Sequence, residues 1–540
     1  MKIKLGMIAG PFFLLVVAVS LAWASGDNLY SLIRLFDKIA VTVSDKYVDQ
    51  LDDEKLIFAG IEGMLGKLDP YSRYLTDNDY FYLLQETQGE YAGVGIEIDK
   101  TGDSLWVSSV IKNSPASKAN IKIGDRLIKI DTIAVIEKSI PDCRKLLRGD
   151  KNTNVLLTLY RPLLSKKLTL NIIRDDIHIE AVPYWFVDQH NNGYLKIARF
   201  SEGSVFAVKS VISMLRDKNI NGLIIDLRDN PGGLLYESIE VAALFLKKGD
   251  RVVETKSRGD ATMHVYDVRE NGVYTDGPLT VLINGQTASA AEIVAGAIQD
   301  NDRGLIIGTT SFGKGLVQQI LKFSDNSALK LTTAKYYTPS DRCIQKDKPE
   351  DNIFVNDDDD DKLLFFTKSG RPVFGGGGII PDIYVEEYEY KPLVDEVITL
   401  GYVDEFVDSY SKRKTIERDF KIDDSTIDEF IHYIKSQGYV YQSELYRKFL
   451  EFKSLSESES NNRLGEPVDN IESALKDNAE KDLVSMRAEF EWVLYEHLIN
   501  HVHGEKAALE LAGQYTDPEI KRASEVLKNP ETYGSLLVGY

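Results

Sequence analysis

Ser289 is the first residue whose type and position allow covalent chemistry. It lies in Thr287-Ala-Ser-Ala-Ala-Glu-Ile293, after the apolar segment Leu279–Ile283 and at the start of a helical pattern. A strand that turns into a helix exposes the side chain at the turn, and the first helical N–H groups remain available to an anion. The same letters describe a capping box, in which Ser289 and Glu292 only satisfy the helix end. The segment alone therefore predicts either a nucleophile or a cap.

Lys314 is a candidate for the base that a serine nucleophile needs. It stands in Ser311-Phe-Gly-Lys-Gly315, and no histidine is near Ser289 in the sequence. The spacing Gly308-x4-Gly313-Lys314 approaches a phosphate-binding loop, but that motif needs Ser or Thr next, where this chain has glycine. A lysine whose surroundings disfavour its charged form can lose its proton near neutral pH and act as a general base. We therefore prefer a base to a nucleotide ligand.

A third segment, Asp226-Leu-Arg-Asp-Asn-Pro-Gly-Gly233, follows a short apolar run. Gly232 and Gly233 allow unusual backbone angles and a close approach of other chain segments. A turn at this place can aim an N–H group at the oxyanion of an acyl-transfer reaction. A tight strand-to-helix turn is the purely structural interpretation, and the two are compatible.

Composition excludes several other classes of function. The chain has 540 residues with 64 Lys and Arg against 84 Asp and Glu, and its net charge of −20 argues against a nucleic-acid partner. Two cysteines exclude a disulfide scaffold and a Cys-rich zinc module. His497 and His501 have metal-binding spacing but lack the Glu of a zinc helix, and the five aspartates at 357–361 lack the pattern of a calcium loop. The sequence predicts no metal and no cofactor.

The candidate residues lie in a multidomain α+β chain. Apolar residues at helical spacing predict an N-terminal helical segment over 28–82. Short strands with glycine turns, in the order β-β-α-β-α-β, predict a compact peptide-binding module over 83–163. Strands that alternate with helices predict a layered α/β core over 164–392, and 393–540 is predicted to be a helical extension.

Residues 1–24 predict a targeting segment. They contain Lys2 and Lys4, an uncharged apolar stretch from Leu5 to Ala24, and an Ala22-Trp-Ala24 end. This pattern is typical of a secretory signal peptide. A stretch of about 20 apolar residues also suffices for an uncleaved membrane anchor, so membrane association through this segment stays open. Either interpretation predicts a periplasmic or other extracytoplasmic location.

Together these segments resemble, in order and over nearly the whole mature chain, the carboxy-terminal processing (tail-specific) serine peptidases. The matching motifs are Leu68-Asp-Pro-Tyr-Ser72, Ala92-Gly-Val-Gly-Ile96, Asp226-Leu-Arg-Asp-Asn-Pro-Gly-Gly233, Thr287-Ala-Ser-Ala-Ala-Glu-Ile293, Gln299-Asp300, Ser311-Phe-Gly-Lys-Gly-Leu-Val-Gln318, Thr333-Ala-Lys-Tyr-Tyr-Thr-Pro339 and Gly378-Ile-Ile-Pro-Asp382. Each motif is weak alone, whereas their order and spacing are specific. The chain departs from the family at Thr287 and Ala291, which replace serines, and at Pro339-Ser-Asp-Arg-Cys343, which replaces P-S-G-R-S.

The resemblance implies a role for each candidate. Ser289 corresponds to the nucleophile, Lys314 to the general base and Gln318 to a residue that supports the lysine amine. The oxyanion donors would be the N–H of Ala290 and that of Gly232 or Gly233. The core would have the crotonase/ClpP-like layered fold.

The resemblance also makes the 83–163 module a PDZ domain, which would add the C-terminal segment of a substrate as an extra strand. The residues that would receive its terminal carboxylate are Gly93, Val94, Gly95 and Ile96. The implied activity is a serine endopeptidase that cleaves exported proteins with apolar tails at or near their C-termini, without a cofactor.

Two further questions stay open from the sequence. An adaptor protein or a second copy of the chain remains a candidate partner. The alternative function is a non-catalytic PDZ scaffold with a degenerate peptidase core. The joint presence of Ser289, Lys314 and Gln318 favours the enzyme.

Overall fold

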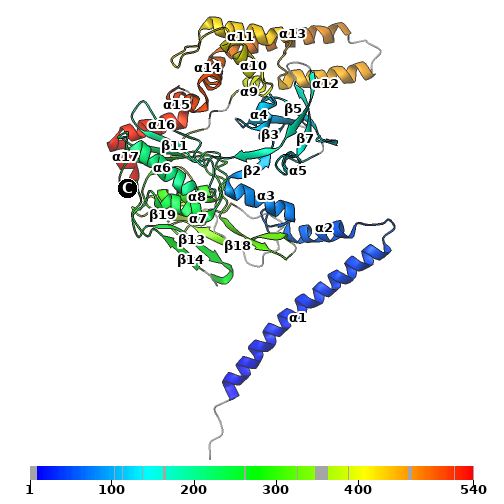
Figure 1. Ribbon diagram of the computed structural model, residues 1–540, viewed down its shortest axis with the longest axis vertical. Coiled ribbons are helices and arrows are strands. Elements are labelled where there is room, and N and C mark those ends of the chain that lie inside the picture. The colour runs from blue at the N-terminus through cyan, green and yellow to red at the C-terminus, as the bar shows by residue number, and fades with distance from the viewer. Residues whose placement is uncertain are drawn as a thin grey trace, which may run out of the picture. The chain divides into compact units, whose positions relative to one another are not determined.

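The computed structural model describes residues 9–101, 104–111, 113–136, 138–161, 166–260, 263–324, 326–346, 363–386, 388, 390–459, 465–515 and 517–538. Residues 1–8 of the predicted signal segment and the aspartate run at 357–361 lie outside these ranges. The chain forms two compact units: a smaller one of residues 1–77, 318–332 and 348–357, and a larger one that contains the rest. Figure 1 labels the elements along the chain, from α1 in blue to α17 in red.

The smaller unit begins with helices, as the apolar spacing predicts. It contains α1 (Ala9–Lys46), α2 (Asp53–Leu65) and β1 (Arg73–Leu75). After α2 the Asp69 carboxylate accepts the N–H groups of Tyr71 (2.8 Å) and Ser72 (2.7 Å), which turns the chain at the Leu-Asp-Pro-Tyr-Ser motif. β1 interrupts the expected helical segment because it pairs antiparallel with residues 328–330. No helix in the described part of the chain has the length and apolar character to cross a bilayer.

The PDZ-like module forms one antiparallel sheet of strand order β3-β4-β5-β7-β8, with β6 on β5. Its elements are β2 (Glu90–Gly93), β3 (Ile96–Thr101), β4 (Ser104–Val110), α4 (Pro115–Lys118), β5 (Arg126–Ile130), β6 (Ile133–Ala134), α5 (Ile140–Leu147), β7 (Asn154–Arg161) and β8 (Lys166–Ile173). Ser114 and Ser139 cap α4 and α5, where the sequence predicts helices. β8 lies beyond the expected end of the module at 163, and it extends the sheet because it pairs with all of β7.

The core of the larger unit is a six-stranded sheet of order β10-β11-β12-β15-β16-β21, parallel except for the β10–β11 pair. Its strands are β10 (Tyr184–Val187), β11 (Gly193–Lys196), β12 (Leu223–Asp226), β15 (Leu279–Ile283), β16 (Leu305–Gly308) and β21 (Ile383–Tyr384). The helices between them are α6 (Ser204–Arg216), α7 (Leu235–Ala243) and α8 (Ala290–Asp300). β12, β15 and β16 are buried along their whole length, which explains why they are continuous apolar runs.

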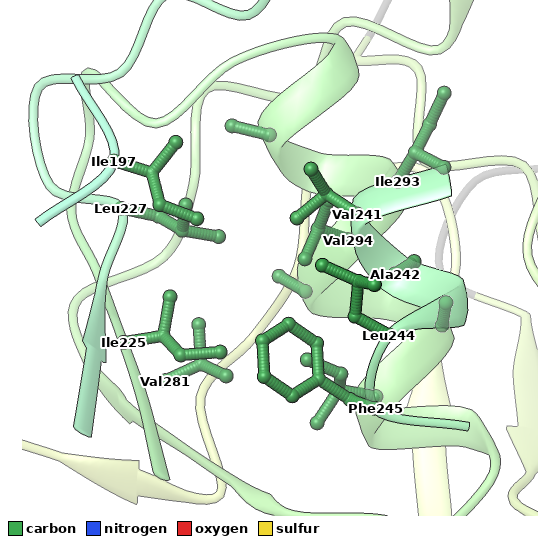
Figure 2. Packing of buried hydrophobic residues seen from close by; sticks show 14 of the residues in the cluster. Ile197, Ile225, Leu227, Val241, Ala242, Leu244, Phe245, Val281, Ile293 and Val294 are labelled. Atoms are coloured by element: carbon green, nitrogen blue, oxygen red, sulfur yellow. The ribbon is translucent and has the colours of Figure 1, made fainter. Parts of the chain in front are cut away.

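Successive residues of β12 and β15 belong to different hydrophobic clusters. Ile225 and Val281 pack with α7 and α8, whereas Ile224 and Leu282 pack in a second cluster with residues of the chain's last helices. Figure 2 shows the first cluster, in which Ile225 and Val281 face Phe245 across a common apolar core. The sheet therefore has helices on both faces, as the alternating pattern of the core predicts.

The remaining elements complete the sequence of the chain. The short connecting elements are α3 (Asp77–Gln88), β9 (Asp175–His178), β13 (Arg251–Ser257), β14 (Met263–Asp267), β17 (Leu316–Lys322), β18 (Ala328–Tyr337), β19 (Leu364–Phe366) and β20 (Pro372–Phe374). The helical extension comprises α9 (Pro392–Thr399), α10 (Tyr402–Ser411), α11 (Asp424–Ser436), α12 (Glu444–Glu459), α13 (Gly465–Ser485), α14 (Arg487–His503), α15 (Glu505–Tyr515), α16 (Pro518–Lys528) and α17 (Pro530–Leu537). Helices α9, α10, α11 and α14 share a hydrophobic core of their own.

Candidate active site

Ser289 occupies the turn between β15 and α8, at the N-cap position of the helix. Its backbone has φ 55° and ψ −116°, a conformation that residues with a side chain seldom adopt. Thr287 holds the turn, because its Oγ1 accepts the N–H of Asn284 at 2.9 Å and donates to the carbonyl of Leu227 at 2.8 Å. Ser289 itself is half-buried, so its side chain retains access to solvent.

The Gly232–Gly233 turn approaches the backbone of Ser289 closely. Both glycines have positive φ, 97° and 142°. A Cβ atom on Gly232 would lie 2.9 Å from the Ala290 nitrogen and 3.0 Å from Cβ of Ser289, and one on Gly233 would lie 2.0 Å from the Phe200 carbonyl oxygen. Glycine is therefore required at both positions, and the third predicted segment lies against the first.

The N–H groups of this turn differ in their availability. The Gly232 N–H donates to Oδ1 of Asn230 at 2.9 Å, so it already has an acceptor. Within the described residues the N–H groups of Gly233 and Ala290 have no hydrogen-bond acceptor. Ala290 is the first residue of α8, where the helix leaves N–H groups without an internal partner.

Glu292 connects the Ser289 turn to the Lys314 loop. Its carboxylate is fully buried and accepts four hydrogen bonds: Oε2 from the N–H of Ser289 (2.7 Å) and of Lys314 (2.9 Å), and Oε1 from the N–H of Gly313 (2.7 Å) and the hydroxyl of Ser311 (2.5 Å). One oxygen atom thus joins the backbones of the two residues that the sequence singles out. Burial raises the pKa of this carboxyl above its ordinary value, and the hydrogen bonds oppose that shift.

Other motifs hold the Lys314 loop from its far side. The Ser311 hydroxyl accepts the N–H of Ile379 at 2.6 Å, and the Gly315 N–H donates to Oε1 of Gln345 at 2.9 Å. A Cβ on Gly378 would lie 2.6 Å from the Ser311 carbonyl oxygen, so the Gly-Ile-Ile-Pro-Asp motif packs directly on the loop. Lys314 is half-buried between these segments.

The other end of α8 is fixed by a buried ion pair. Asp300, the last residue of α8, lies 2.7 Å from Nη2 of Arg342, and both side chains are completely buried. The same guanidinium donates to Oε1 of Gln299 at 2.7 Å. Asp341 stands where the family motif has glycine and adopts φ 66°, a left-handed conformation that Asp tolerates better than most residues. Asp341 thus adopts a backbone conformation that glycine also adopts readily.

Gln318 belongs to the smaller unit and is described there. It is the third residue of β17, and its Nε2 donates to Oγ1 of Thr332 at 3.2 Å. The Thr332 N–H in turn donates to the Ser72 hydroxyl at 3.0 Å, which connects this segment to the Leu-Asp-Pro-Tyr-Ser motif. The larger unit thus brings together the segments of Ser289, Ala290, Lys314 and the two glycines, whereas Gln318 is placed only within its own unit.

The predicted carboxylate loop of the PDZ module is a tight turn between β2 and β3. Gly95 has φ 81°, and a Cβ there would lie 2.3 Å from Cβ of Ser114. The carbonyls of Val94 and Gly95 accept the N–H groups of Ala116 (2.9 Å) and Ile111 (3.0 Å). The N–H groups of Val94 and Gly95 have no acceptor in the described chain. Gly93 ends β2 and Ile96 begins β3.

Comparisons with known proteins agree with this arrangement. The sequence model of peptidase family S41 matches residues 191–355, a PDZ domain model matches 106–161, and one described as "Probable PDZ-protease, C-terminal helical domain" matches 393–527. The carboxy-terminal-processing protease of Bartonella bacilliformis is 39% identical over 345 residues, which cover 63% of this chain and 79% of that protein. The carboxy-terminal processing protease CtpA of Bacillus subtilis is 33% identical over 324 residues, 60% and 68% of the two chains.

The chain belongs to peptidase family S41. Like its relatives in that family it is a C-terminal processing serine protease with a PDZ domain, which confirms the resemblance drawn from the motifs. A solved photosystem II D1 C-terminal processing protease is similar at 27% identity with a TM-score of 0.42, over 65% of this chain and 92% of that one. Most of the helical extension, residues 393–527, matches the C-terminal helical domain described for a probable PDZ-protease.

The sequence left several supporting residues of this S41 site without a function. The sequence predicts only a capping role for Glu292, and its bonds to the Lys314 loop have no local signal because their donors lie about twenty positions further along the chain. Tyr336, whose hydroxyl donates to the Ser289 carbonyl at 3.1 Å, carries no signal beyond its place in the Thr-Ala-Lys-Tyr-Tyr-Thr-Pro motif. Asn230, whose side chain accepts the Gly232 N–H, has no signal beyond its place in the Asp-Leu-Arg-Asp-Asn-Pro-Gly-Gly segment.

Proposed function

We propose that the protein is a Ser–Lys endopeptidase, in which Ser289 is the nucleophile and Lys314 the general base. Lys314, in its neutral form, takes the proton of the Ser289 hydroxyl as Oγ attacks the scissile carbonyl. The protonated amine then gives its proton to the leaving amine of the product. Water hydrolyses the acyl-enzyme in a second cycle of the same kind and restores both residues.

The observation that carries this proposal is the Glu292 carboxylate shared by the two backbones. Its Oε2 lies 2.7 Å from the backbone nitrogen of Ser289 and 2.9 Å from the backbone nitrogen of Lys314. Because both nitrogens contact the same oxygen atom, the backbones of the two residues lie close together. A nucleophile and its base must be held in one geometry for proton transfer to be efficient. A plain capping box requires neither a lysine loop nor four donors on one buried carboxylate.

The oxyanion of the tetrahedral intermediate would be bound by backbone amides. The N–H groups of Ala290 and Gly233 are the available pair beside Ser289, since the Gly232 N–H already donates to Asn230. Backbone donors that are fixed before the reaction stabilise the developing charge without reorganisation. Gln318 would support the lysine amine through its side-chain amide.

The PDZ domain would select substrates with apolar C-terminal tails. The unpaired N–H groups of Val94 and Gly95 are suited to a terminal carboxylate, and Gly93 and Ile96 frame that turn. The substrate tail would pair as an added strand, with apolar side chains toward the module's core. The apolar segment at 5–24 supports an exported protein, either released from its signal peptide or anchored by it.

The test is cleavage of an unfolded protein that ends in an apolar tail. Ser289→Ala and Lys314→Ala should each abolish cleavage while thermal unfolding stays that of the wild type. Activity that survives in either variant would refute the dyad, and a wild type without activity would favour the non-catalytic PDZ scaffold. Gly95→Ala should raise KM for that substrate more than it lowers kcat, and a substrate with a charged tail is the matched control.

A further inference from the structure

The last helices of the chain form part of the peptidase core. Ile520, Ala523 and Leu527 of α16 pack with Ile224, Leu282 and Ile307 of the central sheet. A Cβ on Gly222, just before β12, would lie 3.1 Å from a methyl carbon of Leu527. Tyr533 of α17 donates its hydroxyl to the carbonyl of Leu279 (3.0 Å) and accepts the N–H of the same residue (2.9 Å). This face of the sheet is therefore covered by residues far from the core in sequence.

Arg228 connects α16 to the segment that contains the oxyanion glycines. Its guanidinium binds Asp226 through Nε (3.0 Å) and Nη2 (2.6 Å), and its Nη1 binds Glu519 (2.6 Å) and Asp517 (2.9 Å) of the α16 end. The exposed fractions of the four side chains are 12% for Arg228, 0% for Asp226, 4% for Glu519 and 15% for Asp517. One guanidinium thus contacts three largely buried carboxyl groups.

The residues directly after Arg228 hold the nucleophile turn. Asp229 donates its N–H to Oδ1 of Asn284 (3.0 Å) and accepts the side-chain amide of Asn284 (2.9 Å). The Asn230 carbonyl accepts the N–H of Ala288 at 2.9 Å. Its side chain accepts the N–H of Gly232, as described above. A displacement at Arg228 would therefore be transmitted to both sides of the oxyanion site.

We propose that Arg228 is a positioning residue, which Asp517 and Glu519 of α16 hold so that residues 229–233 keep their place against Ser289 and Ala290. The inference rests on the proposed roles of Ser289 and the oxyanion amides. It gives the C-terminal helices a function in catalysis: they anchor the oxyanion segment from the opposite face of the sheet. Arginine suits this task because its planar fork binds Asp226 and the α16 carboxylates at the same time, which a lysine cannot do.

Ion pairing by itself does not explain why Arg228 and the three carboxyl groups are buried together. Buried ion pairs are often no more stabilising than apolar residues of similar volume, because each charged group must be desolvated. A cluster of one guanidinium and three carboxyl groups specifies geometry, since the fixed directions of the guanidinium N–H groups set where each carboxyl group must lie. The geometry it fixes is that of the segment 226–228, at the start of the oxyanion turn.

The experiment compares the double variant Asp517→Asn/Glu519→Gln with the wild-type full-length chain. Asn at 517 still caps α16, so the helix keeps its start. The matched control is Glu525→Gln, which makes the same chemical change on the exposed side of α16. Measurements are kcat and KM on the apolar-tail substrate, and hydrogen exchange of the amides at 229–234 followed by mass spectrometry. Arg228→Met is the second variant.

The double variant should lose about 10- to 100-fold in kcat, as expected for a small misplacement of catalytic groups, with KM nearly unchanged and faster exchange at 229–234. Glu525→Gln should match the wild type in all three. The inference is overturned if the double variant has the kcat and the hydrogen exchange of the wild type. This holds even if Arg228→Met is impaired or fails to fold. A wild type without peptidase activity would refute the proposed function, and the exchange result would still decide whether α16 orders the 229–234 segment.

Discussion

Replacing Glu292 by Gln tests whether this residue holds the active site or only caps α8. The change keeps the size of the side chain and converts one of its two acceptor oxygens into an NH2 donor. If the amide faces the Oε2 side, it meets the N–H groups of Ser289 and Lys314. If it faces the Oε1 side, it meets the N–H of Gly313 and the Ser311 hydroxyl. Either orientation places donors against donors in a fully buried site.

The cost can be set from these contacts. A buried donor without an acceptor costs about 1–3 kcal/mol, so two of them reduce the free energy of unfolding by about 2–6 kcal/mol. A chain with a typical stability of about 5–15 kcal/mol survives most of that range. The same variant should also lose activity, because a shift of about 1 Å between nucleophile and base lowers kcat on the order of 100-fold.

The assay measures kcat on the apolar-tail substrate together with urea unfolding of the same preparations. The control is Glu270→Gln, because Glu270 is an exposed glutamate of the peptidase domain. This substitution should leave both quantities unchanged. Ser311→Ala removes one of the four donors and should lie between the control and Glu292→Gln. If Glu292→Gln unfolds at lower urea concentration but turns over substrate as fast as the wild type, Glu292 is only a structural cap and the reasoning is refuted.

Three further predictions concern other parts of the larger unit. Gly232→Ala should abolish cleavage, because its Cβ would lie 2.9 Å from the Ala290 nitrogen, and wild-type kcat would exclude this segment from the active site. Asp300→Asn should lower the free energy of unfolding by about 3–5 kcal/mol in urea denaturation, because it leaves the buried Arg342 cation without its counter-charge. Burial raises the pKa of Glu519 from 4.5 to about 7, so the folded chain holds a proton that the unfolded chain releases, and stability should fall as pH rises through that window. Thermal unfolding against pH should show this slope in the wild type and a flatter curve in Glu519→Gln.

Much of the fold could be predicted because its signals are local. The buried parallel strands are continuous apolar runs, and the helical pattern that follows Ser289 becomes α8. The elements that the sequence does not predict depend on distant partners. β1 is a three-residue strand that forms only because residues 328–330 pair with it. β8 follows residues 162–165, and its membership of the PDZ sheet is fixed by the register with β7 rather than by its own composition.

The function of the last helices could not be read from their sequence for the same reason. Their apolar spacing predicts amphipathic helices, but a helix face does not identify the surface that it covers. Asp517 looks like an ordinary N-cap, and Glu519 looks like an ordinary acidic residue of the first turn, where its charge favours the helix dipole. Only the fold brings them to Arg228, which stands 291 positions before Glu519.

Glu292 shows how one local pattern can serve two functions. A Ser-x-x-Glu segment predicts that the glutamate accepts the N–H of the serine, and the structure has this bond at 2.7 Å. In a capping box the glutamate accepts this one bond, and the serine side chain makes the reciprocal bond to the glutamate N–H. A carboxylate has capacity for more acceptor bonds, and here the additional donors are Ser311, Gly313 and Lys314. The same carboxylate therefore caps α8 and binds the Lys314 loop. It does the second only because that loop supplies further donors. Full burial of the glutamate in a Ser-x-x-Glu turn is therefore the feature that indicates a second set of hydrogen bonds.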